Sequence, residues 1–349
     1  MSYACYTERI ETEAKVVHVT KKQKRGQSWF SDFKRNVQRG KLSSAVQNLT
    51  TMKPQKPIDA EMAVQKGAVA LKNDAVKDAL TYFDQAITHD PRYALAYNQR
   101  GVCYFQLREF DNAQADFEYA VELAPDVALF HTDLSTVFLA TKQYDEAIYS
   151  CSHALNLAPE LSQARRNRVL AYFETGDLDN TMRDIKRLLA KYPNDAQLTQ
   201  TLGLCQVLRG EYLESIDMLS RTLKFAGDSS LALSYRALAY IQTDKYREAV
   251  ADCDIALVMT PNNLMLLNNR GIARAYMGDT EGAIADCTKA IMLDPEFSYA
   301  YGSRGFAHMQ AGDLEQAKTD LAKAVSLDET NTRIGEWLDE VNAKLGDDK

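Results

Sequence analysis

Apolar and polar positions along the chain follow one motif that returns at a fixed spacing. In the stretch AYNQRGVCYFQL, residues 96–107, a glycine, two amides and an arginine interrupt an otherwise apolar helical pattern. The same arrangement returns as LLNNRGIARAYM at 266–277 and as AYGSRGFAHMQA at 300–311. The offsets from the first stretch, 170 and 204 residues, are five and six times 34. The pattern therefore predicts helices arranged in a 34-residue repeat.

Proline and small residues support this period. Proline marks the ends of the predicted helices, because a helix cannot continue through it. Seven of the eight prolines share one phase of 34, namely Pro57, Pro91, Pro125, Pro159, Pro193, Pro261 and Pro295. Twelve positions earlier in the same register stands a small residue, at Ala45, Ala79, Ala113, Ala147, Thr181, Ser215, Ala249, Ala283 and Ala317. A third phase holds glycine at Gly67, Gly101, Gly203, Gly271 and Gly305. Small residues at fixed positions indicate close contact between two helices.

This repeat resembles the tetratricopeptide repeat, a 34-residue helix-turn-helix unit with the pattern W-x2-L-G-x2-Y…A-x3-F…P. Residues 94–127 carry most of that pattern, at Tyr97, Gly101, Tyr104, Ala113, Phe117, Ala120 and Pro125. The repeats in phase with it, without any insertion, are 60–93, 94–127, 128–161, 162–195, 196–229, 230–263, 264–297 and 298–331. Positions 1–34 are counted from the first residue of each repeat, and the two helices of a repeat are called A and B.

Both ends of the array depart from the pattern. A divergent copy at 26–59 places Trp29, Gly40, Leu42, Ala45, Leu49 and Pro57 at the expected positions. After residue 331, the helical spacing of Ile334, Leu338, Val341 and Leu345 predicts a capping helix in 332–349, which covers the last apolar face of a solenoid. The resemblance extends over roughly nine-tenths of the chain. It implies an all-α, right-handed superhelical solenoid of about nine repeats with a C-terminal cap.

Two positions of the repeat vary together within the chain. Position 7 is arginine in five repeats, at Arg100, Arg168, Arg236, Arg270 and Arg304. Position 23 of the same repeats is aspartate, at Asp116, Asp184, Asp252, Asp286 and Asp320. Where position 7 is Leu134 or Leu202, position 23 is Ser150 or Met218. The correlation predicts five ion pairs that fix helix A to helix B, in which a partly buried guanidinium finds a carboxylate.

The family resemblance implies that the A helices line a concave groove where a partner protein binds. The groove residues expected on this basis are Asn98, Gln99, Asp133, Arg166, Asn167, Gln200, Tyr235, Asn268, Asn269, Tyr276, Tyr299 and Phe306. A line of amides can exchange hydrogen bonds with the main chain of an extended peptide. The alternative is that these amides only solvate an exposed helix face.

Near the C-terminal end the groove positions become aromatic and apolar, at Tyr235, Met265, Tyr276, Tyr299, Phe306 and Met309. Rigid aromatic side chains often anchor a partner, so we expect a hydrophobic pocket there. The alternative is that these residues are stacked core side chains.

Catalytic and metal chemistry is not expected from this sequence. The five cysteines within the repeats stand at buried helical positions, without a CxxC motif or a Cys/His cluster at zinc spacing. The sequence contains neither a phosphate-binding glycine loop nor the motifs G-x-S-x-G and H-E-x-x-H. We therefore expect no enzyme activity, no cofactor, no metal and no small-molecule substrate. The lysine that opens the chaperone-binding carboxylate clamp of the family is also missing from position 5 of every repeat.

The charge of the chain is concentrated at its N-terminal end. Residues 1–59 hold 12 Lys and Arg against 5 Asp and Glu, which gives a charge of +7. Because the net charge of the chain is −7, the remaining residues carry −14. Residues 1–25 are expected to form a basic, mobile arm. Contact of residues 1–35 with an anionic membrane or nucleic acid stays an alternative to the divergent repeat. Without a secretion signal or an apolar run, we expect a cytoplasmic protein, unless a signal or lipid anchor was removed.

The sequence divides into the arm 1–25, the divergent repeat 26–59, repeats 60–195, a degenerate repeat 196–229, repeats 230–331 and the cap 332–349. Off-pattern residues in the two repeats from 162 to 229 predict a hinge or a change of curvature near 181–228. We expect a non-enzymatic scaffold or adaptor that binds extended peptides or helices of one or more proteins. A bacterial envelope, pilus or secretion assembly factor and a regulatory or targeting subunit of a separate enzyme are the alternatives. The oligomeric state stays open.

Overall fold

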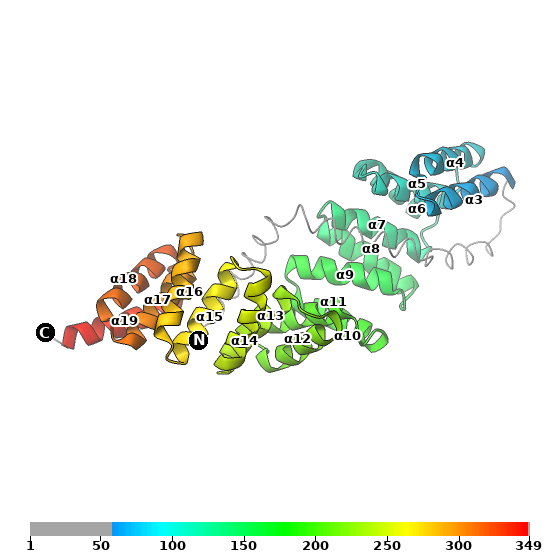
Figure 1. Cartoon of the computed structure of the whole chain (residues 1–349). Helices are drawn as coiled ribbons and strands as arrows, with labels where there is room; N and C mark the ends of the chain where they lie inside the picture. The colour runs from blue at the N-terminus through cyan, green and yellow to red at the C-terminus, as the bar shows by residue number, and fades with distance from the viewer. Residues whose placement is uncertain (1–57, 348–349) are drawn as a thin grey trace. The chain divides into compact units, whose positions relative to one another are not determined.

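The computed structural model describes residues 58–347, and these residues form helices joined by short turns, with no strand among them (Figure 1). The helices are α3 (Ile58–Lys72), α4 (Val76–His89), α5 (Ala94–Gln106), α6 (Phe110–Leu123), α7 (Ala128–Ala140), α8 (Tyr144–Leu157), α9 (Ser162–Thr175), α10 (Leu178–Lys191), α11 (Ala196–Leu208), α12 (Tyr212–Ala226), α13 (Ser230–Gln242), α14 (Tyr246–Met259), α15 (Leu264–Tyr276), α16 (Thr280–Leu293), α17 (Ser298–Ala311), α18 (Leu314–Leu327) and α19 (Thr332–Asp347). The predicted all-α repeat fold is confirmed. The basic arm and almost all of the divergent repeat lie outside the described residues, as do their predicted contacts.

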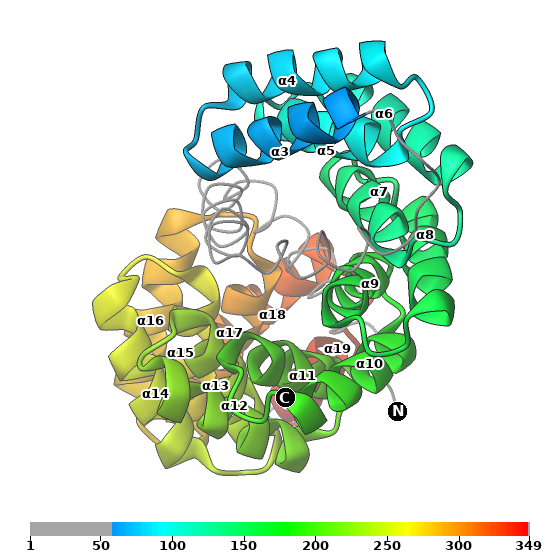
Figure 2. The same ribbon diagram turned by 90° about the vertical axis from the view of Figure 1, so that its right-hand side faces the viewer.

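Each repeat is one pair of helices, so that odd-numbered helices from α3 to α17 are A helices and even-numbered helices from α4 to α18 are B helices. The residues form two compact units, one within 58–191 and one within 192–347. In each unit every helix packs against the next one in sequence, and each A helix also packs against the A helix of the following repeat. Figure 2 shows the helix pairs of each unit following one another as layers. This arrangement is that of a repeat solenoid.

The turn from helix A to helix B has the same backbone conformation in all eight described repeats. Position 15 adopts a positive φ in each of them, at Asp74, Arg108, Lys142, Gly176, Gly210, Asp244, Gly278 and Gly312. The next N–H closes the turn onto the carbonyl of position 11, as from Glu109 to Tyr104 over 2.9 Å. This bond satisfies a carbonyl at the helix end that has no partner inside the helix.

The turn from helix B to helix A explains the proline phase. Helix α4 ends at His89, and the Asp90 N–H still donates to Ala86 O over 2.9 Å. Pro91 follows and has no N–H to extend the helix. The same bond precedes Pro125, Pro159, Pro261 and Pro295. The in-phase prolines therefore mark the boundaries between repeats.

Glycine stands at position 8 in five of the eight described repeats, where helix B approaches closely. An ideal Cβ on Gly67 would lie 2.5 Å from Cε1 of Phe83, and one on Gly271 would lie 2.6 Å from Sγ of Cys287. Both neighbours occupy position 24 of the same repeat. Because a real Cβ does not come this close to another atom, position 8 must be small wherever the residue at position 24 points at it.

The last helix, α19, covers the end of the array. Its Ile334 and Val341 are buried against the core formed with α17 and α18. An ideal Cβ on Gly302 would lie 2.5 Å from Cδ1 of Ile334, so α17 and α19 approach closely at this point. The helix predicted for 332–349 is therefore present as Thr332–Asp347.

The boundary between the two units lies between Lys191 and Tyr192. It falls inside the segment 181–228, where the sequence predicts a hinge. Motion at this boundary stays a prediction.

Candidate partner-binding pocket

The five predicted ion pairs are present, and each is bidentate. In Arg100, Nε donates to Asp116 Oδ2 and Nη2 donates to Asp116 Oδ1, both over 2.8 Å. The other four arginines bind their aspartates through the same two nitrogens at distances of 2.6 to 3.1 Å. The carboxylates are buried and the guanidinium groups are about one-fifth exposed. Such paired geometry adds direction to the charge interaction.

Each of these arginines also reaches a side chain of the preceding repeat, which the sequence reasoning did not predict. Arg100 Nη1 donates to Asp84 Oδ1 over 2.8 Å, and Arg270 Nη1 donates to Asp254 Oδ1 over 2.6 Å. The corresponding acceptors for the other three arginines are Ser152, Ser220 and Thr288, at 2.9 to 3.1 Å. All five acceptors precede their arginine by 16 residues. The sequence did contain a signal for these bonds. A short side chain with an acceptor oxygen stands at position 25 of each repeat that precedes a repeat with arginine at position 7.

The predicted groove amides are mostly engaged between neighbouring A helices. Asn98 at position 5 donates through Nδ2 to Oδ2 of Asp133, at position 6 of the next repeat, over 2.9 Å. Ser303 Oγ donates to Asn268 Oδ1 over 2.8 Å with the same spacing of 35 residues. Asn167 Nδ2 donates to Ser135 Oγ over 2.9 Å, also across one repeat boundary. These contacts form a polar ladder inside the array.

This ladder changes the interpretation of several predicted groove residues. Asn98, Gln99, Asn167, Asn268 and Asn269 are at least nine-tenths buried. The alternative that they solvate an exposed face is therefore wrong, and of these five residues Asn268 and Asn269 line the pocket described below. Half-buried groove positions remain on other A helices, at Arg166, Gln200 and Tyr235.

Asp133 is the titratable member of the ladder. It keeps some solvent exposure but is surrounded by protein, and this loss of hydration raises the pKa of its carboxyl from 3.8 to about 6. The hydrogen bond from Asn98 acts in the opposite direction, because it favours the ionised form.

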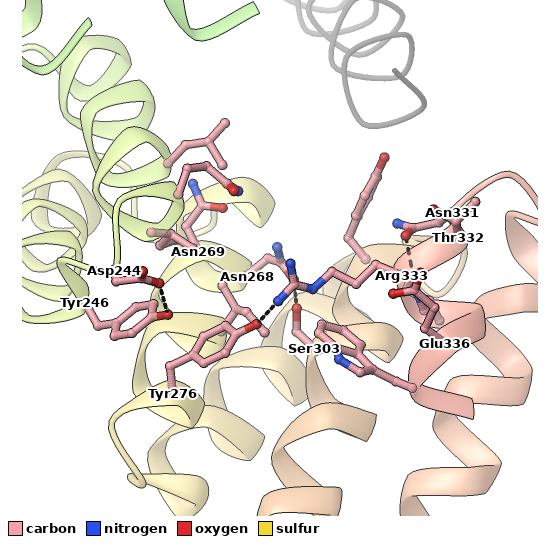
Figure 3. Close-up of a pocket in the computed structure, with 17 residues that line it drawn as sticks. Asp244, Tyr246, Asn268, Asn269, Tyr276, Ser303, Asn331, Thr332, Arg333 and Glu336 are labelled. Atoms are coloured by element: carbon pink, nitrogen blue, oxygen red, sulfur yellow. Dashed lines mark hydrogen bonds between the residues drawn. The ribbon is translucent and has the colours of Figure 1, made fainter. Parts of the chain in front are cut away.

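A pocket of about 370 Å³ lies among α13, α15, α17 and α19 (Figure 3). Four of the predicted groove residues line it, namely Asn268, Asn269, Tyr276 and Tyr299. Leu238, Ile241, Ile272 and Ile334 supply apolar wall. Its volume lies within the range of binding sites, roughly 300–1,000 Å³, and its lining combines apolar with polar and charged side chains.

Aromatic rings form one side of this pocket. The rings of Tyr246 and Tyr276 stack with centroids 4.7 Å apart, Tyr276 contacts Phe306 at 4.8 Å, and Phe306 stacks on Trp337 at 4.6 Å. Phe306 is buried beneath this row and does not line the pocket, which corrects its predicted place in the groove. Phe306 is covered because the capping helix α19 places the ring of Trp337 against it. Tyr235 also does not line the pocket.

Polar groups stand at defined places around the pocket. Arg333 at the start of α19 donates from Nη2 to Tyr276 Oη, and its guanidinium lies 5.3 Å from the ring centroid of Trp337. Figure 3 shows Arg333 reaching across toward Tyr276 and Asn268. Tyr246 Oη donates to Asp244 Oδ1 over 2.6 Å. Burial, followed by this carboxylate neighbour, raises the pKa of Tyr246.

The sequence reasoning missed the contribution of α19 to the site, because it treated 332–349 only as a cap. Arg333 and Trp337 are four residues apart in a helix and therefore lie on the same face. A cation and an aromatic ring on that face, beside the buried Ile334, were the available signal.

Within residues 58–347, metal-binding clusters and membrane-spanning helices are both absent. No group of three or more His, Cys, Asp or Glu side chains in this part of the chain could hold a metal ion. None of its helices combines the length and the apolar character that crossing a membrane requires.

Comparisons with known proteins agree with this architecture. Tetratricopeptide-repeat family models match residues 94–127, 266–297 and 298–331. No curated protein matches the chain in sequence. Among solved structures, that of pilF from Pseudomonas aeruginosa aligns with a TM-score of 0.52 at 16% identity, over 60% of this chain and 95% of that one.

Two other solved structures align at a TM-score of 0.50. PilW, a type IV pilus biogenesis factor, is 17% identical over 60% of this chain and 97% of that one. The Cut9–Hcn1 complex of the APC/C contains a chain that is 13% identical, over 80% of this chain and 55% of that one. At these identities the likeness shows the fold alone.

Proposed function

The chain belongs to the tetratricopeptide-repeat family, and on that premise we propose that it is a non-enzymatic scaffold that binds an extended segment or a helix of a partner protein along its A helices. The observation that carries this proposal is the pocket among α13, α15, α17 and α19. It is built from the A-helix face, it is lined by aromatic rings, and the cap completes it. Buried aromatic groups around a pocket are typical anchors of protein interfaces.

The remaining A-helix surface of residues 192–347 supports a binding role that extends beyond the pocket alone. Within residues 192–347, half-buried polar or aromatic groups stand on further A helices at Gln200 and Tyr235, so a bound segment has further groups to contact. A segment bound with a Kd of about 1 μM would have a binding free energy of about −8 kcal/mol. Several such contacts on one partner would raise the overall affinity through effective concentration.

Site-specific photo-crosslinking tests this proposal. A photoreactive amino acid replaces Gln242, which lines the pocket, or Val258, which is 83% exposed on the B helix α14 and serves as the matched control. We expect the Gln242 position to crosslink a protein in native host cells and Ile272→Asp to abolish this product. Crosslinks from Val258 alone, unaffected by Ile272→Asp, would contradict binding on the A-helix face.

The alternatives of a pilus, envelope or secretion assembly factor and of a regulatory subunit stay predictions. The likeness to two pilus proteins concerns the fold and does not favour one of these roles. A cytoplasmic location also stays a prediction, which fractionation of native cells tests.

A further inference from the structure

Arg333 differs from the arginines of the repeat in its partners. The five arginines at position 7 each bind a buried carboxylate, as Arg304 binds Asp320. Arg333 contacts Tyr276 Oη and the face of Trp337, and within the described part of the chain it has no carboxylate partner. Its guanidinium has five N–H donors, so donors remain for a group that enters the pocket.

The backbone adds positive potential at the same place. Helix α19 begins at Thr332, and residues 331–334 line the pocket. The first turn of a helix carries N–H groups without intrahelical acceptors and the positive end of the helix dipole. In α19 the Ile334 N–H donates to Asn331 Oδ1, so the open end of the turn is at residues 332 and 333. A negative group near Arg333 would therefore interact with the side chain and with the start of the helix.

Two buried amides complete the set of polar groups. Asn268 accepts from Ser303 through Oδ1, which leaves its Nδ2 as a donor without an acceptor among residues 58–347. Asn269 is 1% exposed and lines the pocket, and its Oδ1 has no hydrogen-bond donor in the same part of the chain. A buried acceptor without a donor is costly, so a ligand N–H at Asn269 would remove that cost.

We propose that this pocket binds a single carboxylate that is carried by an apolar residue of an extended partner segment. Arg333 and Asn268 donate to the carboxylate, and Asn269 Oδ1 accepts a main-chain N–H of the segment. The apolar side chain packs against Ile272 and Tyr276. This inference rests on the proposed scaffold function and adds the chemistry of the segment that the pocket selects.

The rim of the pocket argues against a run of acidic residues. Asp244 and Glu336 also line it, so the pocket holds two carboxylates and one guanidinium. One incoming carboxylate pairs with Arg333, whereas neighbouring acidic groups would face Asp244 or Glu336. Placing like charges together discriminates against the wrong ligand. The expected segment is therefore apolar around its carboxylate.

The fluorescence of Trp337 gives a direct readout of the pocket. The chain contains two tryptophans, so Trp29→Phe leaves Trp337 as the only one. The probes are short Gly/Ser peptides that end in leucine. One has a free terminal carboxylate, a second has a terminal amide, a third has a terminal amide and an internal glutamate beside the leucine, and a fourth has a run of glutamates.

We expect a carboxylate beside leucine to change the Trp337 emission, and the neutral amidated peptide and the glutamate run to bind at least about tenfold more weakly. Binding of the first peptide assigns the site to a chain terminus, and binding of the third assigns it to an acidic side chain. Arg333→Gln should lower the affinity for the peptide by at least about tenfold. Arg247→Gln, on the exposed side of α14, is the matched control and should leave binding unchanged.

Equal binding of the neutral peptide, no binding of either carboxylate peptide, or an Arg333→Gln variant that binds like the parent would overturn the proposal. Circular dichroism and the thermal midpoint of Arg333→Gln establish that the variant is folded. Crosslinking from Gln242 that persists in Arg333→Gln would leave the scaffold function standing while removing the carboxylate site.

Discussion

Asn98 donates to Asp133 over 2.9 Å and joins position 5 of one repeat to position 6 of the next. The bond holds a carboxylate in surroundings that disfavour its charge, since burial raises the pKa of Asp133 to about 6. A pair that connects two repeats therefore also carries a dependence on pH.

Replacing this carboxylate should change the pH dependence of stability. Because the folded-state pKa of Asp133 is above its unfolded value of 3.8, the folded state binds the proton more tightly, and the contribution of Asp133 to stability falls as the pH rises from about 4 to about 6. Asp133→Asn removes this titration. Relative to the parent, the free energy of unfolding of the variant should rise over this range by at most about 3 kcal/mol, since one pKa unit corresponds to about 1.36 kcal/mol.

Urea unfolding of both proteins at about pH 4 and about pH 7.5 measures this gain. Asp126→Asn, at an exposed carboxylate in the turn before α7, is the control. A free-energy difference between Asp133→Asn and the parent that does not change with pH would show that the carboxyl titrates normally.

The ion pairs lead to a second prediction. Arg236→Leu leaves the Asp252 carboxylate, whose side chain is 6% exposed, without its main partner. We expect a loss of about 2–4 kcal/mol of unfolding free energy, below the fully buried limit because Arg236 is partly exposed. The double variant Arg236→Leu with Asp252→Ser reproduces the combination of Leu134 and Ser150, and should recover most of that loss.

A double-mutant cycle followed by urea unfolding checks this coupling. Arg247→Leu, at an exposed position of α14, should change stability by less than about 0.5 kcal/mol. Additive losses in the double variant would mean that the two side chains do not stabilise each other.

Close contact between α17 and α19 leads to a third prediction. Gly302→Ala places a Cβ 2.5 Å from Cδ1 of the buried Ile334. We expect a loss of about 1–3 kcal/mol from overpacking and a shift of the Trp337 emission as α19 moves. Gly335→Ala, which meets no atom within 4 Å, is the matched control and should stabilise helix α19 by roughly 0.5–1 kcal/mol.

Thermal unfolding and tryptophan fluorescence measure both effects. Adding Ile334→Ala to Gly302→Ala should cost less than the sum of the single changes, because the smaller side chain makes room. Equal stability of Gly302→Ala and the parent would place α19 farther from α17 than the structure does.

Burial of the cysteines leads to a fourth prediction. Five free thiols are buried, and burial is the main cause that raises the pKa of Cys103, Cys151 and Cys205 to about 12. The thiolate is the reactive form, so iodoacetamide at about pH 8 should leave all five unmodified in the native protein. The same cause raises the pKa of the other two thiols, Cys253 and Cys287.

Peptide mapping by mass spectrometry, with and without urea, measures this protection. Val258→Cys, at a position 83% exposed, provides a thiol that should react at once. Rapid native labelling of any of the five would mean that its repeat opens readily. Cys5 lies outside the described residues and is not part of this prediction.

The sequence was sufficient for the fold because each repeat carries its own signals. Pro91 and its equivalents mark the ends of helices, and Gly67 indicates a close contact between the two helices of one repeat. The pairing of Arg100 with Asp116 could be found for the same reason, since both residues vary together within the chain. Signals of this kind depend on one repeat and its internal register.

Contacts between repeats were harder to predict, because they depend on how far one repeat is displaced from the next. The bond from Arg100 to Asp84 and the bond from Asn98 to Asp133 both cross such a boundary. The pocket is a further case, since Arg333 and Trp337 come from a helix outside the repeat pattern. The sequence places these residues on helices but does not specify which neighbours they meet.

The second contact of each position-7 arginine has a consequence for how the array opens. In residues 196–331 these contacts occur at three successive boundaries, through Ser220 with Arg236, Asp254 with Arg270, and Thr288 with Arg304. A run of this kind favours opening in one cooperative step, with amide protons exchanging together. In residues 60–195, Leu134 interrupts the series, and the boundary at residue 128 is instead held by the bond from Asn98 to Asp133 and by a shared apolar core. The pocket lies in the uninterrupted run, and an occupant would slow exchange far beyond the residues it touches.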